Sequence, residues 1–145
     1  MKPGFDYTGI VVVFLCHDGQ GKLLMAKRGL KARDERGKWE FGGGGIEFGE
    51  SPEAAVRREL MEEYRCQTIH DIQLLQPYSI VREHDGQQTH WISFPFAVQI
   101  DPEEVQISEP ESIDSIGWFT LDSLPDPLHP GVHPVISACK KEKSA

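Results

Sequence analysis

Residues 42–67 read GGGGIEFGESPEAAVRRELMEEYRCQ, a run of glycines followed by a segment rich in charged residues. The second part of this stretch predicts a helix from residue 52 to residue 64. Ser51 suits the N-cap position, and Pro52 suits the first helical position, where its missing N–H leaves no helical bond unmade. Apolar side chains recur every fourth residue and form one stripe along the helix: Val56, Leu60 and Tyr64. The stretch therefore predicts a glycine-rich loop that leads into an amphipathic helix.

Three carboxylates occupy a second face of the same helix. Glu59, Glu62 and Glu63 stand at positions i, i+3 and i+4, which lie together on a helix surface. Their face is turned by roughly 110° from the apolar stripe, at about 100° per residue. An exposed acidic face is one interpretation, since like charges at this spacing cost only about 0.2–0.5 kcal/mol per pair. The alternative is a cation site, because Mg²⁺ prefers oxygen ligands and glycines let the backbone approach a ligand closely.

The stretch resembles the Nudix box, a motif written G-x5-E-x7-R-E-U-x-E-E-x-G-U, in which U is an apolar residue. Counted from Gly44, the motif positions fall on residues of the required type: Glu50, Arg58, Glu59, Leu60, Glu62 and Glu63. Cys66 fills the last apolar position, and Gly42 replaces the proline that is common ahead of the paired glycines. Arg65 stands where the family has a glycine that ends the helix in a left-handed turn. We expect Arg65 to adopt that strained conformation or to end the helix differently, at a modest cost in stability.

The resemblance implies hydrolysis of a nucleoside diphosphate linked to another moiety, X. Water attacks a phosphorus atom with the help of Mg²⁺ or Mn²⁺, and the protein mainly supplies positioning and charge neutralisation. The resemblance implies these metal ligands, all oxygen donors: Glu59, Glu62, Glu63 and a backbone carbonyl of the glycine loop, at Gly43. Arg58 is expected to orient a glutamate of the catalytic site through an ion pair, either Glu59 or Glu50.

The general base stays open among carboxylates of the box and of later loops: Glu62, Glu63, Glu83, Asp85, Glu109 and Glu111. For each late acid, a solvated loop charge is the simpler interpretation. In the MutT-like branch of the family an acidic residue directly precedes the late tryptophan. Here Gly117 precedes Trp118, so that ligand does not transfer to this chain.

The fold implied is α/β, a Nudix-type α/β/α sandwich with a mixed central sheet and a loop-helix-loop box. Runs of β-branched and aromatic residues predict strands at these segments: 7–15, 22–27, 39–41, 72–81, 89–100 and 116–120. Residues 29–38 and 101–111 are polar or acidic and predict loops. Residues 133–141 predict a terminal helix.

Composition limits the remaining choices. The 145 residues suit a single domain, 1–145. A net charge of −8 argues against a nucleic-acid polymer or a membrane surface as partner, because both attract basic patches. Three scattered cysteines predict neither a disulfide framework nor a zinc site, and we expect the protein to be located in the reducing cytoplasm. The chain has neither a signal-peptide core nor a run long enough to cross a membrane. The oligomeric state is left open, with a homodimer among the alternatives.

The box indicates a nucleotide-type small molecule as substrate without identifying X. Lys27 and Arg28 are candidates for phosphate binding, although a solvated strand end explains them equally well. Trp91 is a candidate for base stacking, because alternation places it opposite the phenylalanines of its strand. Val132 stands where enzymes that hydrolyse oxidised guanine nucleotides use an asparagine, and valine cannot make those hydrogen bonds. The alternative to an enzyme is a non-catalytic nucleotide-sensing or protein-binding module on the same fold, but the complete set of box acids favours the enzyme.

Overall fold

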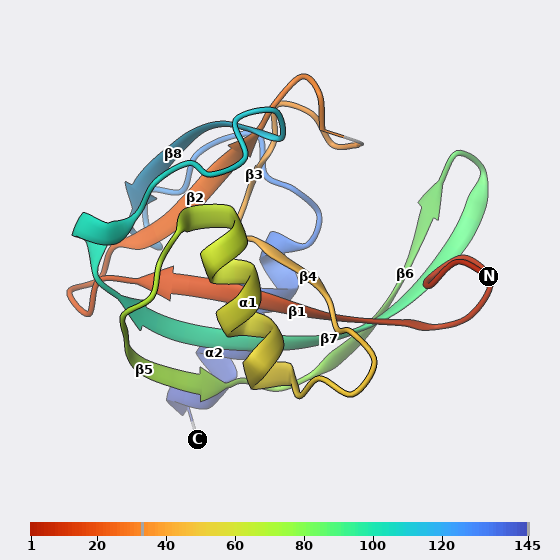
Figure 1. The fold of residues 1–145 in the computed structure, drawn as a ribbon, viewed down its shortest axis with the longest axis horizontal. Helices are drawn as coiled ribbons and strands as arrows, with labels where there is room; N and C mark the ends of the chain where they lie inside the picture. Colours follow the sequence, from red (N-terminus) through yellow and green to blue (C-terminus); the bar gives the residue numbers. More distant parts are fainter. Residues whose placement is uncertain (33, 145) are drawn as a thin grey trace.

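The computed structural model describes residues 1–32 and 34–144 and consists of a central sheet with one helix on each face (Figure 1). The elements follow one another along the chain in this order: β1 (Gly9–His17), β2 (Leu23–Arg28), β3 (Trp39–Glu40), β4 (Gly43–Gly45), α1 (Pro52–Tyr64), β5 (Ile69–Leu74), β6 (Tyr78–His84), β7 (Gln87–Ile100), a 3-10 helix (Pro102–Glu104), β8 (Ile113–Phe119) and α2 (Val132–Ser144). Within the described part of the chain, neither α-helix combines the length and apolar character needed to cross a bilayer.

Strand β1 lies at the centre of the sheet. It runs parallel to β7 over its whole length, from the pair Gly9 and Trp91 to the pair His17 and Gln99. The other strand pairs are antiparallel, and the main path through the sheet is β3-β2-β1-β7-β5. β4 pairs with β1, β6 with β7, and β8 with β2. This mixed sheet between two helices confirms the predicted α/β sandwich.

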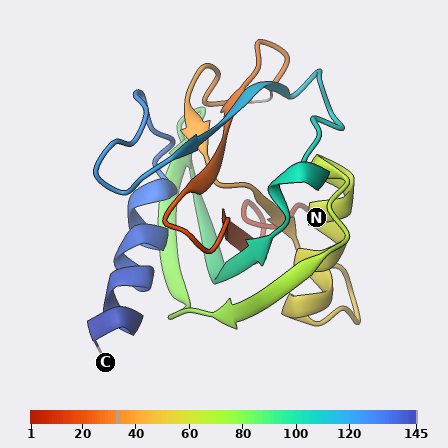
Figure 2. The same cartoon turned by 90° about the vertical axis from the view of Figure 1, so that its left-hand side faces the viewer.

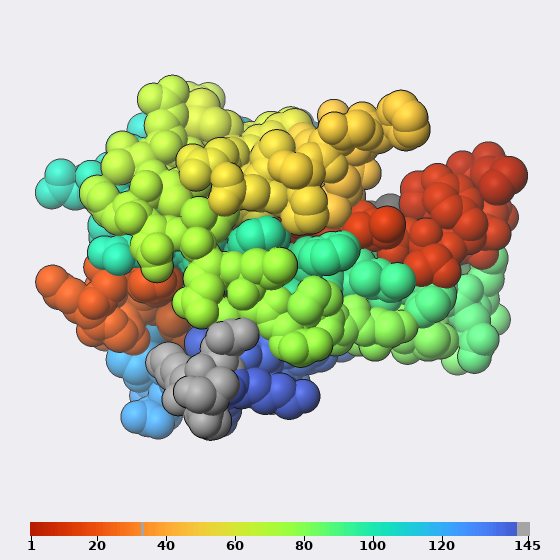
Figure 3. All heavy atoms as spheres, turned by 90° about the horizontal axis from the view of Figure 1, so that it is seen from below, coloured from red at the N-terminus to blue at the C-terminus, as the bar shows by residue number. Residues whose placement is uncertain are grey.

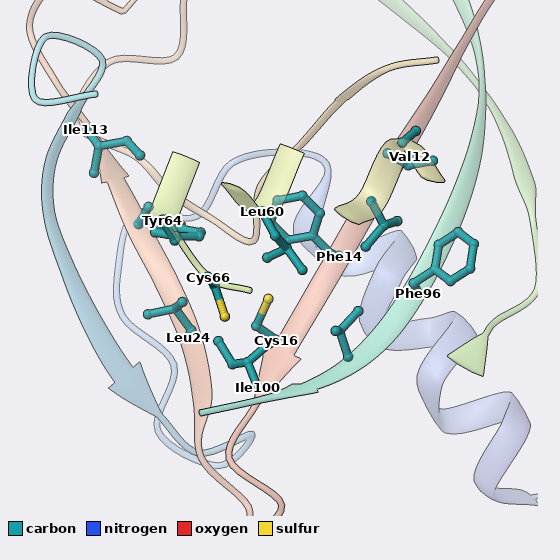
Figure 4. Close-up of a cluster of buried hydrophobic side chains, with 14 residues drawn as sticks. Val12, Phe14, Cys16, Leu24, Leu60, Tyr64, Cys66, Phe96, Ile100 and Ile113 are labelled. Carbon is teal, nitrogen blue, oxygen red and sulfur yellow. The ribbon is translucent and has the colours of Figure 1, made fainter. Parts of the chain in front are cut away.

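The two helices cover opposite faces of the sheet, as Figure 2 shows. The apolar stripe predicted for α1 is buried against side chains of β1, β2 and β7 (Figure 4). On the other face, α2 buries apolar side chains of its first two turns against β1 and β2: Val132, Val135 and Ile136. Each helix therefore has a fixed orientation on the sheet, and α1 holds its second, acidic face beside the glycine strand β4.

Both ends of α1 are set by local interactions. The Ser51 Oγ atom accepts a hydrogen bond from the Ala54 N–H at 3.1 Å, as expected of an N-cap. At the other end Arg65 has φ 56° and ψ 29°, the left-handed conformation. The Arg65 N–H donates to the Met61 carbonyl at 3.0 Å, and the Cys66 N–H donates to the Leu60 carbonyl at 3.3 Å. Arg65 thus ends the helix as the family's glycine would, at a cost of about 1–2 kcal/mol for a residue with a Cβ atom.

The prediction of a single strand at residues 72–81 is wrong. Two strands, β5 and β6, occupy this region, and they pair with successive parts of the long strand β7. Pro77 lies between them, and proline cannot donate to a strand ladder. Before it, the Leu75 N–H donates to the Pro95 carbonyl at 2.8 Å. The predicted loop at 101–111 likewise contains a 3-10 turn at Pro102–Glu104.

Candidate active site

The glycine strand β4 pairs with β1 in the sheet and also contacts helix α1. Its residues pair with the middle of β1, from Val11 opposite Gly45 to Val13 opposite Gly43. A Cβ atom added to Gly43 would lie 2.1 Å from the Val12 carbonyl oxygen, so only glycine lets the two backbones approach this closely. The close approach places the backbone of β4 directly beside the carboxylates of α1.

Arg58 is at the centre of an ion-pair network rather than at an open surface. Its Nε and Nη2 atoms donate to the two carboxylate oxygens of Glu50, at 2.8 and 2.9 Å. Its Nη1 atom donates to Glu59 Oε1 at 2.9 Å. The bond to Arg58 is the largest cause that lowers the pKa of Glu50, to about 2. Arg58 thus forms ion pairs with both of its predicted partners, Glu50 and Glu59. The bidentate bond to Glu50 joins the loop to the helix.

Glu59 packs against the glycine loop. A Cβ atom at Gly44 would lie 2.2 Å from Glu59 Oε1, so any larger residue at position 44 would displace this carboxylate. Burial raises the pKa of Glu59, and the bond to Arg58 opposes that effect. Glu59 is therefore held between a backbone and a guanidinium, with little freedom to reorient.

Glu63 carries the most unusual carboxylate of the site. Its Oε2 atom is buried and has no hydrogen-bond partner among the described residues. Burial raises its pKa well above the usual value, and the charges of three neighbouring carboxylates add to the effect: Glu59, Glu40 and Glu109. A hydrogen bond from the Gly43 N–H opposes this rise in the pKa. A buried acceptor surrounded by like charges is costly unless a cation or a proton compensates it.

Glu62 lies further out than its two partners. Its side chain is 53% exposed, and its Oε2 atom is 3.5 Å from Arg58 Nη1. In the part of the chain that the structure describes, no three His, Cys, Asp or Glu side chains are gathered closely enough to form a metal-binding group. The joint ligation of a metal by Glu59, Glu62 and Glu63 therefore stays a prediction.

The predicted phosphate-binding residues lie in different environments. Arg28 forms ion pairs with Asp34 at 2.9 Å and Glu40 at 2.8 Å, so its charge is already compensated within the protein. Lys27 precedes it on β2, where it pairs with Trp39 of β3. Neither contact tests phosphate binding, which stays a prediction for both residues.

The indole of Trp91 packs against backbone. Cβ atoms added to Gly4 and Gly9 would lie 2.2 and 2.5 Å from its ring, and its Nε1 atom donates to Thr89 Oγ1 at 3.1 Å. Trp91 thereby helps to hold the N-terminal segment beside the β6–β7 hairpin, at one end of the molecule in Figure 3. Its predicted role in base stacking remains untested.

The late acidic residues separate in space. Glu109 is close enough to the box for its charge to raise the pKa of both Glu59 and Glu63. Glu83 and Asp85 lie instead at the tip of the β6–β7 hairpin. The sequence did not single out Glu40, whose charge also raises the pKa of Glu63. The signal available in the sequence was its place in the lead-in segment 39–41, two residues before the first glycine of the loop.

Residues 7–139 match the family model described as the NUDIX domain. The chain belongs to the Nudix family. A MutT Nudix hydrolase from Burkholderia pseudomallei has the same fold, with a TM-score of 0.79 at 26% identity and coverage of 92% of this chain and 98% of that one. The box resemblance and the sandwich fold are both confirmed by this match.

Curated Nudix relatives include enzymes with different substrates in their names. An RNA pyrophosphohydrolase from Bartonella bacilliformis is 28% identical over 137 residues, covering 81% of this chain and 79% of that protein. An oxidized purine nucleoside triphosphate hydrolase from Danio rerio is 30% identical over 118 residues, covering 80% and 68%. This chain is accordingly a MutT-like Nudix pyrophosphohydrolase, from a family that binds nucleotide substrates and typically depends on divalent metal ions.

Proposed function

We propose that this Nudix protein hydrolyses a diphosphate linkage in a nucleoside triphosphate or a nucleoside diphosphate-X, with water attacking phosphorus. The observation that carries the proposal is the buried, unpartnered Oε2 atom of Glu63 beside the carboxylate of Glu59. An arrangement of this kind is unfavourable for an empty protein and suits a site that binds positive charge. The position of both carboxylates against the glycine loop supports the same conclusion.

The residues fit Mg²⁺, or Mn²⁺ in its place. Carboxylate and carbonyl oxygens are the ligands that hard cations prefer, and the proposed set consists of them: Glu59, Glu62, Glu63 and the Gly43 carbonyl. When bound, the ion would neutralise charge on the diphosphate and favour the hydroxide form of a water molecule. Glu62, the most exposed of the three acids, would need to turn inward from its present position.

The remaining residues of the box serve positioning. Arg58 fixes Glu59 from one side while its bidentate bond to Glu50 fixes the loop. Because a guanidinium stays charged at any working pH, this arrangement does not depend on proton uptake. For the general base, the proximity of Glu109 to the box favours it over the acids of the β6–β7 hairpin. Glu109 would accept a proton from the attacking water.

The test is a hydrolysis screen with Mg²⁺ and with EDTA. The screen compares nucleoside triphosphates, nucleotide sugars, ADP-ribose and dinucleoside polyphosphates. A triphosphorylated RNA oligonucleotide belongs in it, because relatives named RNA pyrophosphohydrolases weaken the exclusion of polymers that net charge suggested. We expect metal-dependent turnover of at least one substrate. Binding without hydrolysis across the whole screen would favour the non-catalytic module.

The variant Glu63→Gln tests the site itself, with Glu53→Gln as the matched control on the exposed side of α1. Loss of a charged ligand should remove about 3 kcal/mol or more of transition-state stabilisation, roughly a hundredfold in rate. Mg²⁺ should also raise the melting temperature of the wild type and of the control, but not that of Glu63→Gln. Metal-dependent turnover near the wild-type rate in Glu63→Gln would refute the assignment of Glu63 as a metal ligand.

A further inference from the structure

A groove of about 690 Å³ borders the glycine strand on the side of the N-terminal segment. Two parts of the chain form its walls, residues of the N-terminal segment between 2 and 11 and the box loop 44–50, and Trp91 of β7 also lines it. In Figure 3 the loop, drawn in yellow-orange, and the N-terminal segment, drawn in red, project beside each other at one end of the molecule. The volume of the groove lies within the range of about 300–1,000 Å³ that is typical of small-molecule sites.

The groove is continuous with the candidate active site. Gly44, against which the Glu59 carboxylate packs, is one of its lining residues. A molecule in the groove therefore lies next to the position proposed for the diphosphate. Two carboxylates of the groove wall, Glu47 and Glu50, form ion pairs with Arg58 at 3.7 and 2.8 Å. Because their charge is compensated within the protein, the wall can accept part of an anionic substrate.

Exposed apolar side chains gather in this groove. Phe48 lies in the turn of the box loop and is fully exposed. Tyr7 and Ile10, on the N-terminal wall, are 49% and 47% exposed. Nine large apolar side chains are exposed within the described residues, and these three share one groove. An exposed apolar patch of this kind marks a binding surface, since its burial by a ligand is favourable.

Polar side chains of the groove wall are engaged within the protein. The Thr8 Oγ1 atom bonds to His90 Nδ1 at 2.8 Å, and the Trp91 Nε1 atom donates to Thr89 Oγ1 at 3.1 Å. A ligand rich in hydroxyl groups, such as a hexose, would leave some of them unpaired against the apolar wall, which is unfavourable. A flat heteroaromatic ring avoids this cost, because it offers an apolar face that stacks on aromatic side chains.

We propose that this groove binds the X group of the substrate, and that X carries a planar heteroaromatic ring that stacks on Phe48. The diphosphate would extend from the carboxylates of Glu59 and Glu63 to the groove. Tyr7 and Ile10 would contact the same ring from the opposite wall. This inference rests on the proposed function for the diphosphate site, and it narrows X to groups with an aromatic ring rather than a sugar alone.

Substitutions at Phe48 separate stacking from other effects of the loop. Phe48→Ala removes the stacking face, whereas Phe48→Trp retains one. Leu30→Ala is the matched control, because Leu30 is likewise exposed on a loop but lies outside the groove. All three substitutions are at exposed positions, so the melting temperatures should remain close to that of the wild type.

The assay is calorimetric titration, in Mg²⁺ buffer, with analogues of diadenosine diphosphate and of ADP-ribose. Both probes join adenosine through a diphosphate to the 5′ position of a ribose, and only the first carries a base on that ribose. A methylene group replaces the bridging oxygen of each diphosphate and prevents hydrolysis. We expect the wild type to bind the diadenosine probe tenfold or more tightly than the ADP-ribose probe. Phe48→Ala should reduce that preference roughly tenfold, the usual effect of losing one stacking side chain, whereas Phe48→Trp and Leu30→Ala should retain it.

A second readout observes the Phe48 ring directly. In ¹³C spectra of ring-labelled phenylalanine, the Phe48 signal is the one that is missing from Phe48→Ala. This signal should shift with the diadenosine probe, because a stacked base adds its ring current, and should stay unchanged with the ADP-ribose probe.

The inference is overturned if the wild type binds the two probes equally, if Phe48→Ala keeps the preference, or if the Phe48 signal does not respond. Equal binding would assign the groove to another occupant, such as a protein partner. Failure of the proposed function is distinguishable, because it would abolish metal-dependent hydrolysis by the wild type across the substrate screen without altering these binding differences.

Discussion

Replacing Arg65 by glycine should stabilise the protein, although it removes a side chain. Arg65 has φ 56°, a conformation that costs a residue with a Cβ atom about 1–2 kcal/mol and glycine almost nothing. Glycine also adds freedom to the unfolded chain, which offsets about 0.5–1 kcal/mol of the gain. The exposed hydrogen bond from Arg65 Nε to Ser108 Oγ, at 3.3 Å, contributes no more than about 0.5 kcal/mol. The central expectation is a net gain of about 0.5 kcal/mol.

Urea denaturation measures this gain, and Arg65→Ala is the control. Alanine removes the bond to Ser108 and keeps the unfavourable backbone conformation, so its midpoint should be equal to or below that of the wild type. For a domain of this size, Arg65→Gly should also raise the melting temperature by about 1–2 °C. Hydrolytic activity should be unchanged, because Arg65 contacts none of the box carboxylates. A midpoint for Arg65→Gly at or below that of Arg65→Ala would refute the role assigned to the left-handed turn.

Two other predictions concern the glycine loop and the pH dependence of stability. In Gly44→Ala the new Cβ atom would lie 2.2 Å from Glu59 Oε1, so kcat/KM should fall by about a hundredfold. The control Gly45→Ala has open space at its Cβ position, so its kcat/KM should stay near that of the wild type. An equal loss of kcat/KM in the two variants would contradict the role assigned to Gly44. Bonds from Thr68 hold the pKa of Glu104 at about 2, below its unfolded value of about 4.3, so Glu104 stabilises the folded state above pH 5 and less as pH falls toward 2. Urea midpoints of wild type and Glu104→Gln should therefore differ most near pH 6 and converge near pH 2, and a difference independent of pH would count against the mechanism.

The box helix could be predicted from sequence because its signals are local. Ser51, Pro52 and the apolar stripe lie within a few residues of the features that they determine, and α1 begins and ends where they indicate. The sequence also limited the end of the helix at Arg65 to two alternatives, a left-handed turn or a different helix end, and the structure has the left-handed turn. Strand pairing is less local. The break between β5 and β6 depends on how both align with β7, and the sequence of 72–81 alone does not contain that alignment.

The candidate site shows the same division. The motif fixes the spacing of Glu59 and Glu63, but their surroundings come from other segments: the Gly43 N–H bonds to Glu63, and the charge of Glu109 raises the pKa of both carboxylates. His129 comes from a proline-rich segment with no periodic pattern, yet it lines a cavity together with Glu40 and the glycine loop, and its backbone N–H bonds to Trp39 of β3. A sequence pattern does not indicate such a meeting between distant segments.

The parallel pair of β1 and β7 also affects the order in which the molecule is built. The surface that receives the apolar stripe of α1 includes Phe96, Val98 and Ile100 of β7 as well as residues of β1. Contacts between segments so far apart in sequence close large loops and form slowly. During synthesis, the box therefore emerges from the ribosome before the part of its supporting surface that β7 contributes. Until residues 87–100 have followed, α1 cannot bury its apolar stripe completely.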